Sequence, residues 1–412
     1  METASLFSFA TIGISLLLSL VILVLFIPIA VFAVECLTAV TSQVKTPNPT
    51  PPSTRSQIKT AVLIPAHNEA AIIQDTLTDL NRNRSGHEQV VVVADNCADD
   101  TAEIARSCGV TVLERQDGEK RGKGYALDFG LGYLAADAPE VVIVVDADCM
   151  VQPGAIAALA EKAVTSQRPV QACYLMEQPP DASGKTAISA LAFLVKNLVR
   201  PLGLQQLGWP CLLTGTGMAF PWSAIQSISL ASGNIVEDMQ SSVDLAIASQ
   251  APIFCGEALV IGCLPQQDTA ATSQRTRWEH GHMQTLLTQV PRLLQAFAQQ
   301  RQFDLLALAL DLSVPPLSLL ILVWLAVAVA TAISVGVGIS PMMLLGAIAL
   351  QGIGLFLAVV ASWVRFGRDR VSAIALLSVP FYILWKIPLY FAFLIKPQVE
   401  WVRTARDNRN KI

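Results

Sequence analysis

The sequence has little charge, and this scarcity excludes most classes of soluble protein. Only 15% of the 412 residues are Asp, Glu, Lys or Arg, and 53% are hydrophobic, whereas an ordinary soluble domain is about 25% charged. Intrinsic disorder needs low hydrophobicity with high charge, so a disordered chain is excluded as well. The charges gather between Lys45 and Arg301 and nearly disappear on either side. We therefore expect a chemically ordinary central domain between lipid-facing flanks.

Zinc-binding and nucleic-acid-binding signatures are also lacking. The eight cysteines form no C-x-x-C pair and there are only four histidines, so no zinc site is predicted. His280 and His282 are interpreted as polar groups at the surface or behind a site, because no third ligand lies at a suitable spacing. No basic stretch is interleaved with aromatic residues, so no nucleic-acid partner is predicted. A nucleotide P-loop is excluded, since no Ser or Thr follows Lys123.

The N-terminal flank is predicted to be one membrane helix. Residues 3–34 contain no ionisable side chain and exceed the roughly 20 residues that a helix needs to cross a hydrocarbon core. A cleaved signal peptide would carry basic residues before a shorter apolar core. Only Glu2 precedes this tract, so we interpret residues 1–40 as a retained transmembrane helix. The Pro-, Ser- and Thr-rich residues 41–57 are interpreted as a linker.

The C-terminal flank, residues 312–396, is predicted to hold several helices. Its first uncharged tract, residues 312–364, is long enough for two helices. Its second tract, residues 371–395, carries two prolines and Lys386, which fits a re-entrant or interfacial segment better than a plain span. The alternative is that this tract spans the membrane and that residues 304–311 belong to another crossing.

Basic residues predict the orientation of the chain. Lys45, Arg55 and Lys59 follow the first helix and no basic residue precedes it, so the central domain is expected on the cytoplasmic side. The membrane would be of the bacterial inner or plasma type. The remaining expected divisions are a catalytic domain at residues 58–287, an interfacial helical region at 288–311 and a basic cytoplasmic tail at 397–412.

The central domain alternates short apolar runs with segments of helical spacing. TAVLIPA (60–66), QVVVVAD (89–95), VTVLER (110–115) and EVVIVVDAD (140–148) have the composition of buried strands. Strands that are apolar on both faces and alternate with helices predict an α/β domain with a Rossmann-like, mostly parallel sheet. In such sheets ligands bind beyond the carboxyl ends of the strands.

Polar side chains follow these strands at the edge where ligands are expected. Glu69 follows the first strand, Asp95 ends the second, and Asp146 and Asp148 end the fourth. Two carboxylates at i and i+2 suit a hard divalent cation such as Mg²⁺ or Mn²⁺, with positions left for phosphate oxygens. An isolated pair of this kind is more often structural, so the convergence of three loops carries the prediction. Lys123, between two glycines, offers a cation to a phosphate group.

Three further motifs have both a chemical and a simpler structural interpretation. Glu237-Asp238 precedes an apolar-periodic helix, where it is either favourable charge at a helix N-terminus or a general base, with Asp238 accepting a hydroxyl proton. TGTG (214–217) allows close approach of backbone to a ligand, or forms a plain turn. QRTRW (274–278) suits a diphosphate and a sugar ring, or else anchors the chain at the membrane interface.

Taken in order, these motifs resemble those of the membrane-bound family 2 glycosyltransferases, which include cellulose, chitin and hyaluronan synthases and ceramide glucosyltransferases. That family has a nucleotide-binding Asp, a DxD pair, a later ED pair and Q-x-x-R-W. This chain has Asp95, Asp146-Ala147-Asp148, Glu237-Asp238 and Gln274-x-x-Arg277-Trp278 in the same order, and the resemblance covers residues 59–287. It implies a GT-A fold for the central domain and a nucleotide sugar, expected to be a UDP-sugar, as the donor.

The resemblance also implies a role for each motif. The donor-binding residues would be Glu69, Asp95, Lys123, Asp146 and Arg277, and Asp146 and Asp148 would hold Mg²⁺ or Mn²⁺. Asp238, with Glu237 beside it, would be the catalytic base for an inverting attack by the acceptor hydroxyl. The acceptor-binding residues would be Trp278, Gln274, Thr216 and Gly217. A cellulose product is not expected, because LLTGTG replaces the Phe-Phe-Cys-Gly loop of cellulose synthases.

The expected acceptor is a membrane-associated glycan, in exopolysaccharide or cell-envelope glycan synthesis. Within the same class, the alternative is direct transfer to a membrane lipid such as a ceramide or a diacylglycerol. The alternative from a different class is a non-catalytic membrane protein that binds a nucleotide sugar. The intact Asp238 and the DxD pair argue against that last alternative.

Overall fold

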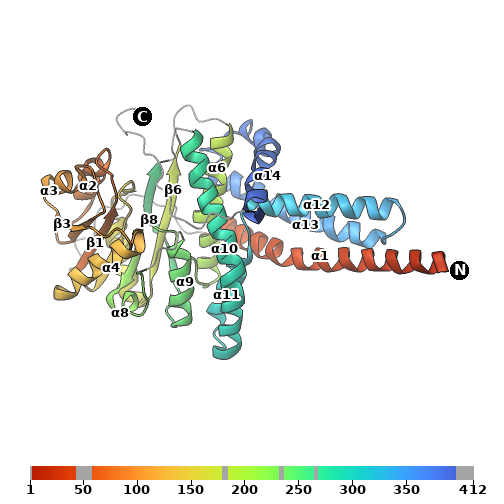
Figure 1. The fold of residues 1–412 in the computed structure, drawn as a ribbon, viewed down its shortest axis with the longest axis horizontal. Coiled ribbons are helices and arrows are strands. Elements are labelled where there is room, and N and C mark those ends of the chain that lie inside the picture. The colour runs from red at the N-terminus through yellow and green to blue at the C-terminus, as the bar shows by residue number, and fades with distance from the viewer. Residues whose placement is uncertain (1, 43–57, 179–183, 232–235, 264–267, 396–412) are drawn as a thin grey trace.

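The structure is a computed structural model of the 412-residue chain, and it describes residues 2–42, 58–178, 184–231, 236–263 and 268–395. A globular part is built on one eight-stranded sheet, and long apolar helices project from it on one side (Figure 1). Residues 43–57 of the expected linker and the whole expected basic tail, 397–412, lie outside the described residues.

The sheet has the strand order β3-β2-β1-β4-β7-β6-β8-β5. The strand bounds are β1 Thr60–Ala66, β2 Gln89–Asp95, β3 Thr111–Arg115, β4 Val141–Val144, β5 Met150–Val151, β6 Val170–Glu177, β7 Met218–Pro221 and β8 Ile253–Cys263. β1 to β4 pair in parallel, as do β6 and β8, whereas β7 and β5 run antiparallel to their neighbours. The predicted α/β fold with a mostly parallel sheet is confirmed.

Helices cover both faces of this sheet, which explains why its strands are apolar on both sides. α2 (Ile73–Asn83), α3 (Thr101–Ser107) and α5 (Ala155–Ser166) pack on one face, and α4 (Lys123–Leu134) and α8 (Trp222–Ile225) pack on the other. α9 (Glu237–Ile247) packs with α10 (Asp268–Gln300) and α11 (Phe303–Ser313). The domain boundary expected at residue 287 falls inside α10, which continues through Pro291.

Three long apolar helices run side by side away from the globular part: α1 (Glu2–Thr41), α12 (Leu317–Gly336) and α13 (Met342–Ser362) (Figure 1). Large apolar side chains on α1, such as Leu16 and Leu23, are more than half exposed. α14 (Val379–Ile395) lies across the base of this bundle instead of running alongside it (Figure 1). Among the described residues, five helices are long and apolar enough to cross a membrane: Thr11–Thr41, Gly184–Gln206, Leu317–Gly336, Met342–Gly367 and Ala375–Ile395.

The helix at Gly184–Gln206 was not anticipated from the sequence, and most of it is buried within the protein. It consists of α6 (Gly184–Leu194), a π-helical turn (Val195–Val199) and α7 (Arg200–Gln206). Its apolar side chains pack between α1 and the strands β6 and β8. Gly203 faces the backbone of Glu35 so closely that a Cβ at this position would collide with the Glu35 carbonyl. This helix is therefore the joint between the sheet and the apolar helices.

Arg200 holds three helices together at this joint. Its Nε donates to Glu35 Oε2 of α1 at 2.6 Å, and its Nη2 donates to Asp311 Oδ1 of α11 at 2.5 Å and to the Asp311 carbonyl at 2.8 Å. All three side chains are less than 10% exposed. Removing one partner of a buried ion pair leaves an uncompensated charge away from water.

We expect Arg200→Met to destabilise the protein by about 3–5 kcal/mol, because it leaves the Glu35 and Asp311 carboxylates buried without their cation. The matched control is Arg292→Met, whose ion pair with Asp244 is partly exposed and should contribute about 0–1 kcal/mol. Thermal unfolding of the full chain in detergent micelles measures both. Equal melting temperatures for the two variants would contradict the assignment.

Candidate functional site

A cavity of about 890 Å³ begins at the carboxyl ends of β1, β2 and β4 and reaches the base of the apolar helices. Pro65 and Asp95 line it at the strand ends. Phe32 of α1, Pro316 at the start of α12 and Lys386 of α14 line its other end. The sheet and the apolar helices therefore share the wall of one cavity.

Nine of the twelve residues selected from the sequence line this cavity: Glu69, Asp95, Lys123, Asp146, Asp148, Glu237, Asp238, Arg277 and Trp278. They come from loops at three strand ends, from the first turns of α4 and α9, and from α10. Their convergence follows from the parallel pairing of β1, β2 and β4, which brings the carboxyl ends of these strands to one edge.

The other three, Gln274, Thr216 and Gly217, are described by the structure but are not among the lining residues. Gln274 is buried on α10, and the Thr216 hydroxyl accepts a hydrogen bond from the Asp146 N–H at 3.0 Å. Gly217 has φ +64°, and a Cβ there would clash with Ala172. The 214–217 loop contributes Thr214 and Gly215 to the cavity wall in place of Thr216 and Gly217.

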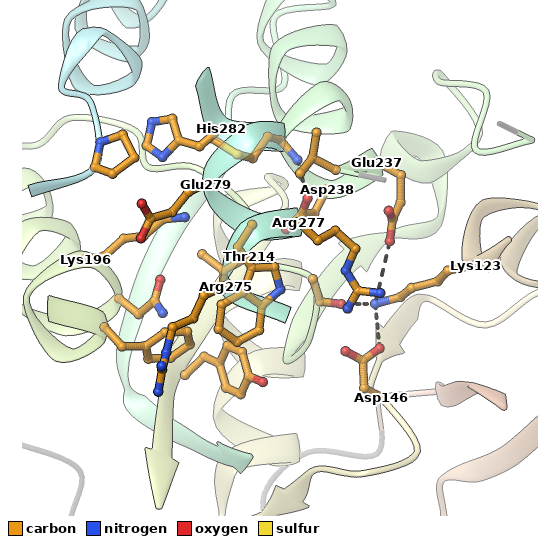
Figure 2. A pocket seen from close by; sticks show the side chains of 18 of the residues that line it. Lys123, Asp146, Lys196, Thr214, Glu237, Asp238, Arg275, Arg277, Glu279 and His282 are labelled. Carbon is orange, nitrogen blue, oxygen red and sulfur yellow. Dashed lines mark hydrogen bonds and ion pairs between the residues drawn. The ribbon is translucent and has the colours of Figure 1, made fainter. Parts of the chain in front are cut away.

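Lys123 joins three segments of the site (Figure 2). Its Nζ lies 2.5 Å from Asp146 Oδ1, 2.6 Å from the Gly215 carbonyl and 3.9 Å from Glu237 Oε1. Gly122, with φ +127°, turns the chain into α4 just before it. Burial alone would lower the pKa of Lys123, but Asp146 and Glu237 outweigh burial and raise the pKa above its ordinary value. The Lys123 ammonium is therefore a permanent charge in the cavity.

Asp146 and Asp148 could hold a divalent cation. Ligand atoms of Asp146, Asp148 and Cys149 all lie within 4.8 Å of one another. Burial, together with the two carboxylates, raises the pKa of the Cys149 thiol well above its ordinary value, so the thiol stays protonated. The remaining donors are carboxylate oxygens, which suit Mg²⁺ or Mn²⁺ rather than zinc.

Glu237 and Asp238 occupy the first turn of α9. Burial raises the pKa of Glu237 to about 7 although Lys123 opposes the shift, and burial also raises the pKa of Asp238 against Lys123. Asp238 Oδ1 accepts a hydrogen bond from the Met239 N–H at 2.8 Å. A carboxylate whose pKa is raised toward neutrality is a better proton acceptor than a free Asp.

Ser242, in the middle of α9, connects this helix to the 213–217 segment beside the cavity. The Leu213 N–H donates to Ser242 Oγ at 2.8 Å, and Ser242 Oγ donates to the Asp238 carbonyl, also at 2.8 Å. On β6, Gln171 Oε1 accepts a hydrogen bond from the Thr214 N–H at 2.8 Å. These bonds fix the position of Asp238 relative to Thr214.

The wall toward the apolar helices contains residues that the sequence interpretation missed, among them Lys196, Asn197, Glu279 and His282. A signal was present, because Lys196, Asn197 and Arg200 interrupt the apolar run 184–206, and polar residues in such a run often mark a functional site. Lys386, noted as unusual in its tract, forms an ion pair with Glu279.

His280 and His282, interpreted from the sequence as groups at the surface or behind a site, do not lie at the surface. They are 2% and 4% exposed because α10 is covered by other helices in this region. His280 Nε2 lies 3.0 Å from the Leu389 carbonyl of α14, whereas His282 lines the cavity. Nearby, the rings of Trp278 and Phe193 pack at a centroid distance of 5.6 Å.

Comparisons with known proteins agree with this arrangement. Residues 57–281 match the family described as Glycosyltransferase like family 2. The uncharacterized protein MJ1222 of Methanocaldococcus jannaschii is 38% identical over 87 residues, which are 21% of this chain and 34% of that protein. The match thus spans about a third of that relative.

Two solved structures are among those to which the chain is similar. The mannosyltransferase PcManGT from Pyrobaculum calidifontis, in complex with GDP-Man and Mn²⁺, has a TM-score of 0.49 at 18% identity, covering 88% of this chain and 99% of that chain. A glucosyl-3-phosphoglycerate synthase from Mycobacterium tuberculosis, in complex with Mg²⁺ and UDP, has a TM-score of 0.37 at 20% identity, covering 57% of this chain and 86% of that chain.

The family match covers more than half of the 412 residues and includes the stretch from Glu69 to Trp278 that supplies most of the cavity wall. On that ground the chain belongs to glycosyltransferase like family 2 and is a glycosyltransferase.

Proposed function

We propose that the protein is an inverting, metal-dependent glycosyltransferase that moves a sugar from a UDP-sugar to a membrane-associated glycan acceptor, in exopolysaccharide or cell-envelope glycan synthesis. One observation carries the proposal: the cavity that contains Lys123, Asp146 and Asp238 continues to the base of the apolar helices. Its volume of about 890 Å³ is near the upper end of the range for single-ligand pockets, about 300–1,000 Å³. Two substrates can therefore meet in it.

The donor would occupy the end of the cavity nearest the strand ends. Glu69 and Asp95 would contact the nucleoside, with Asp95 held by Arg115 Nη1 at 2.6 Å. A divalent cation at Asp146 and Asp148 supplies positive charge to the diphosphate when bound. Lys123 and Arg277 would contribute further positive charge as the diphosphate leaves.

The transfer step would be a single in-line displacement. Asp238 accepts the proton of the acceptor hydroxyl while the hydroxyl oxygen forms a bond to the anomeric carbon of the donor sugar. The bond from that carbon to the diphosphate oxygen breaks on the opposite side, and the nucleoside diphosphate leaves with the electron pair. The anomeric configuration is inverted. Glu237, with a pKa raised to about 7, stands beside the base, and Trp278 offers an aromatic face to the acceptor.

The apolar helices would anchor the enzyme in the membrane with the catalytic domain in the cytoplasm. The exposed apolar side chains of α1, α12 and α13 support this placement, since such a surface is unfavourable in water. α14, which lies across the base of the bundle, would lie at the interface (Figure 1). An acceptor carried by the membrane would then reach the cavity at its Pro316 and Lys386 end.

A donor screen tests this function. The full chain in vesicles made from a total bacterial extract of lipids and lipid-linked glycans is given Mn²⁺ and one radiolabelled nucleotide sugar at a time, and released nucleoside diphosphate is measured. We expect release with a UDP-sugar and ethanol-insoluble product, as for a glycan acceptor. Chloroform-soluble product would favour the lipid alternative, and absence of release with every donor would contradict the proposal.

We expect Asp238→Asn to lower the transfer rate by about 10²- to 10⁴-fold, the usual contribution of a general base. Binding of the nucleotide, measured by calorimetry, should stay unchanged, because Asp238 would contact the acceptor and not the diphosphate. Asp244→Asn on the same helix is the control, since Asp244 pairs with Arg292 outside the cavity. Wild-type turnover in Asp238→Asn would remove the assignment of the base.

The rate should fall as the pH decreases through a midpoint above 3.8, the ordinary pKa of an Asp side chain, because a base with a raised pKa becomes protonated at higher pH. Glu237→Gln should leave this midpoint nearly in place, because Glu237, whose pKa is raised to about 7, is already neutral where Asp238 titrates. Profiles of kcat/KM from about pH 4 to about pH 9 measure the midpoint. A midpoint that moves by about a unit or more in Glu237→Gln would contradict this order of the two pKa values.

A further inference from the structure

Four polar side chains in the cavity wall each have a buried atom without a hydrogen-bond partner among the described residues. The atoms are Asn197 Oδ1, Thr214 Oγ1, Glu279 Oε2 and His282 Nε2. Leaving such an atom unpaired costs about 1–3 kcal/mol, and folded proteins contain few of them. Asn197 and His282 are only 3% and 4% exposed, so the cost applies in full to them. Their gathering around one cavity indicates that a ligand supplies the missing partners.

These four atoms can all accept hydrogen bonds. Asn197 Oδ1 and Glu279 Oε2 have no proton to donate, and the Thr214 hydroxyl can serve either way. Burial lowers the pKa of His282 well below its ordinary value, and Lys196 and Arg200 add to the shift, so its ring is neutral. A neutral imidazole keeps one nitrogen without a proton, so the unpartnered Nε2 can accept a hydrogen bond. The ligand must therefore be rich in donors.

Most cations in this part of the wall already have partners. Four cations, Lys196, Arg200, Arg275 and Lys386, lie here. Arg200 pairs with Glu35 and Asp311, Lys386 pairs with Glu279, and Arg275 Nε donates to Ser189 Oγ at 3.0 Å. A phosphate group would bring its negative charge against the four acceptor atoms, whereas hydroxyl groups would donate to them.

The two ends of the cavity are also separate in space. In Figure 2, Lys196, Glu279 and His282 lie on the side away from Lys123 and Asp146. Arg277 points toward the side where Lys123 lies. Asp238 lies close to Lys123 and to the Thr214–Gly215 turn. A Cβ added at Gly215 would be 3.5 Å from Asp238 Oδ2 and 3.7 Å from Lys123 Nζ.

We infer that Asn197, Thr214, Glu279 and His282 form an acceptor subsite for the hydroxyl groups of an uncharged sugar, and not for a phosphate headgroup. The inference rests on the proposed function, which supplies the donor and the base. Hydroxyl groups provide the donors that the four acceptor atoms lack. The paired rings of Trp278 and Phe193 add an aromatic surface for the sugar ring.

The test compares two amphiphiles with the same alkyl chain, dodecyl maltoside and dodecyl phosphate. Each is titrated into the full chain in phosphatidylcholine nanodiscs, and binding is measured by calorimetry with empty nanodiscs subtracted. We expect the maltoside to bind at least about tenfold more tightly. His282→Phe and Asn197→Leu should each weaken maltoside binding by roughly three- to tenfold, the effect of one hydrogen bond, and leave phosphate binding unchanged.

His280→Phe is the matched control, because it makes the same substitution two residues away on α10 and outside the cavity wall. It should bind the maltoside as the wild type does. Tighter binding of dodecyl phosphate than of dodecyl maltoside would overturn the inference. An affinity for the maltoside that is unchanged in both His282→Phe and Asn197→Leu would overturn it as well.

Two further measurements separate the possible failures. His282→Phe and Asn197→Leu should each have a melting temperature at or above that of the wild type, because they replace atoms that are unpaired in the empty cavity. A melting temperature lower by several degrees in both variants would mean that these side chains stabilise the fold, and would overturn the subsite. Nucleoside diphosphate release is measured for the same variants under the conditions of the donor screen, with acceptor present. If release is absent with every donor, the proposed function fails; if release persists while the headgroup preference is reversed, only the subsite fails.

Discussion

The ammonium group of Lys123 is the contact on which the rest of the site depends. It reaches Asp146 at the end of β4, the Gly215 carbonyl in the 214–217 loop and Glu237 at the start of α9. These three segments are far apart in the sequence, and without a cation between them their carboxylates would repel one another in a poorly solvated cavity. Burial and these neighbours together determine which groups are charged: Lys123 stays positive, while the pKa values of Glu237 and Asp238 rise. One end of the cavity is thereby prepared for an anionic group with a proton acceptor beside it.

The second constraint is the joint between the sheet and the apolar helices. The helix at Gly184–Gln206 is apolar enough to be mistaken for a membrane span, yet it packs inside the protein between α1 and the strands β6 and β8. Its polar residues have two uses: Arg200 holds α1 and α11, and Lys196 and Asn197 face the cavity. The same segment thus fixes the apolar helices to the sheet and forms the wall of the cavity next to them. In this account the membrane anchor and the acceptor end of the site are one structural unit.

Much of this could be predicted from the sequence, and the failures have physical causes. β1 and β2 begin and end where the apolar runs do, and the residues that follow β1 and end β4 line the cavity because parallel strands bring them to one edge. The sequence could not predict which side chains of the 214–217 loop face the cavity. Gly215 and Gly217 both have positive φ, and this backbone path turns Thr214, not Thr216, toward the cavity. The sequence also could not predict which face of α10 is turned toward the cavity. Arg277, Trp278 and His282 line the cavity wall, whereas Gln274 does not. Hydropathy alone could not separate the buried helix at Gly184–Gln206 from a membrane helix, because both are long and apolar enough to cross a membrane.

The central claim is that a single cavity holds the donor at its acidic end and directs the reacting sugar toward Asp238. The most direct measurement is an experimental structure of the full chain with Mn²⁺ and a non-hydrolysable UDP-sugar, with the metal identified by its anomalous scattering. The account predicts manganese at Asp146 and Asp148, the diphosphate beside Lys123 and the anomeric carbon facing Asp238. A nucleotide bound outside this cavity, or a metal remote from Asp148, would contradict it.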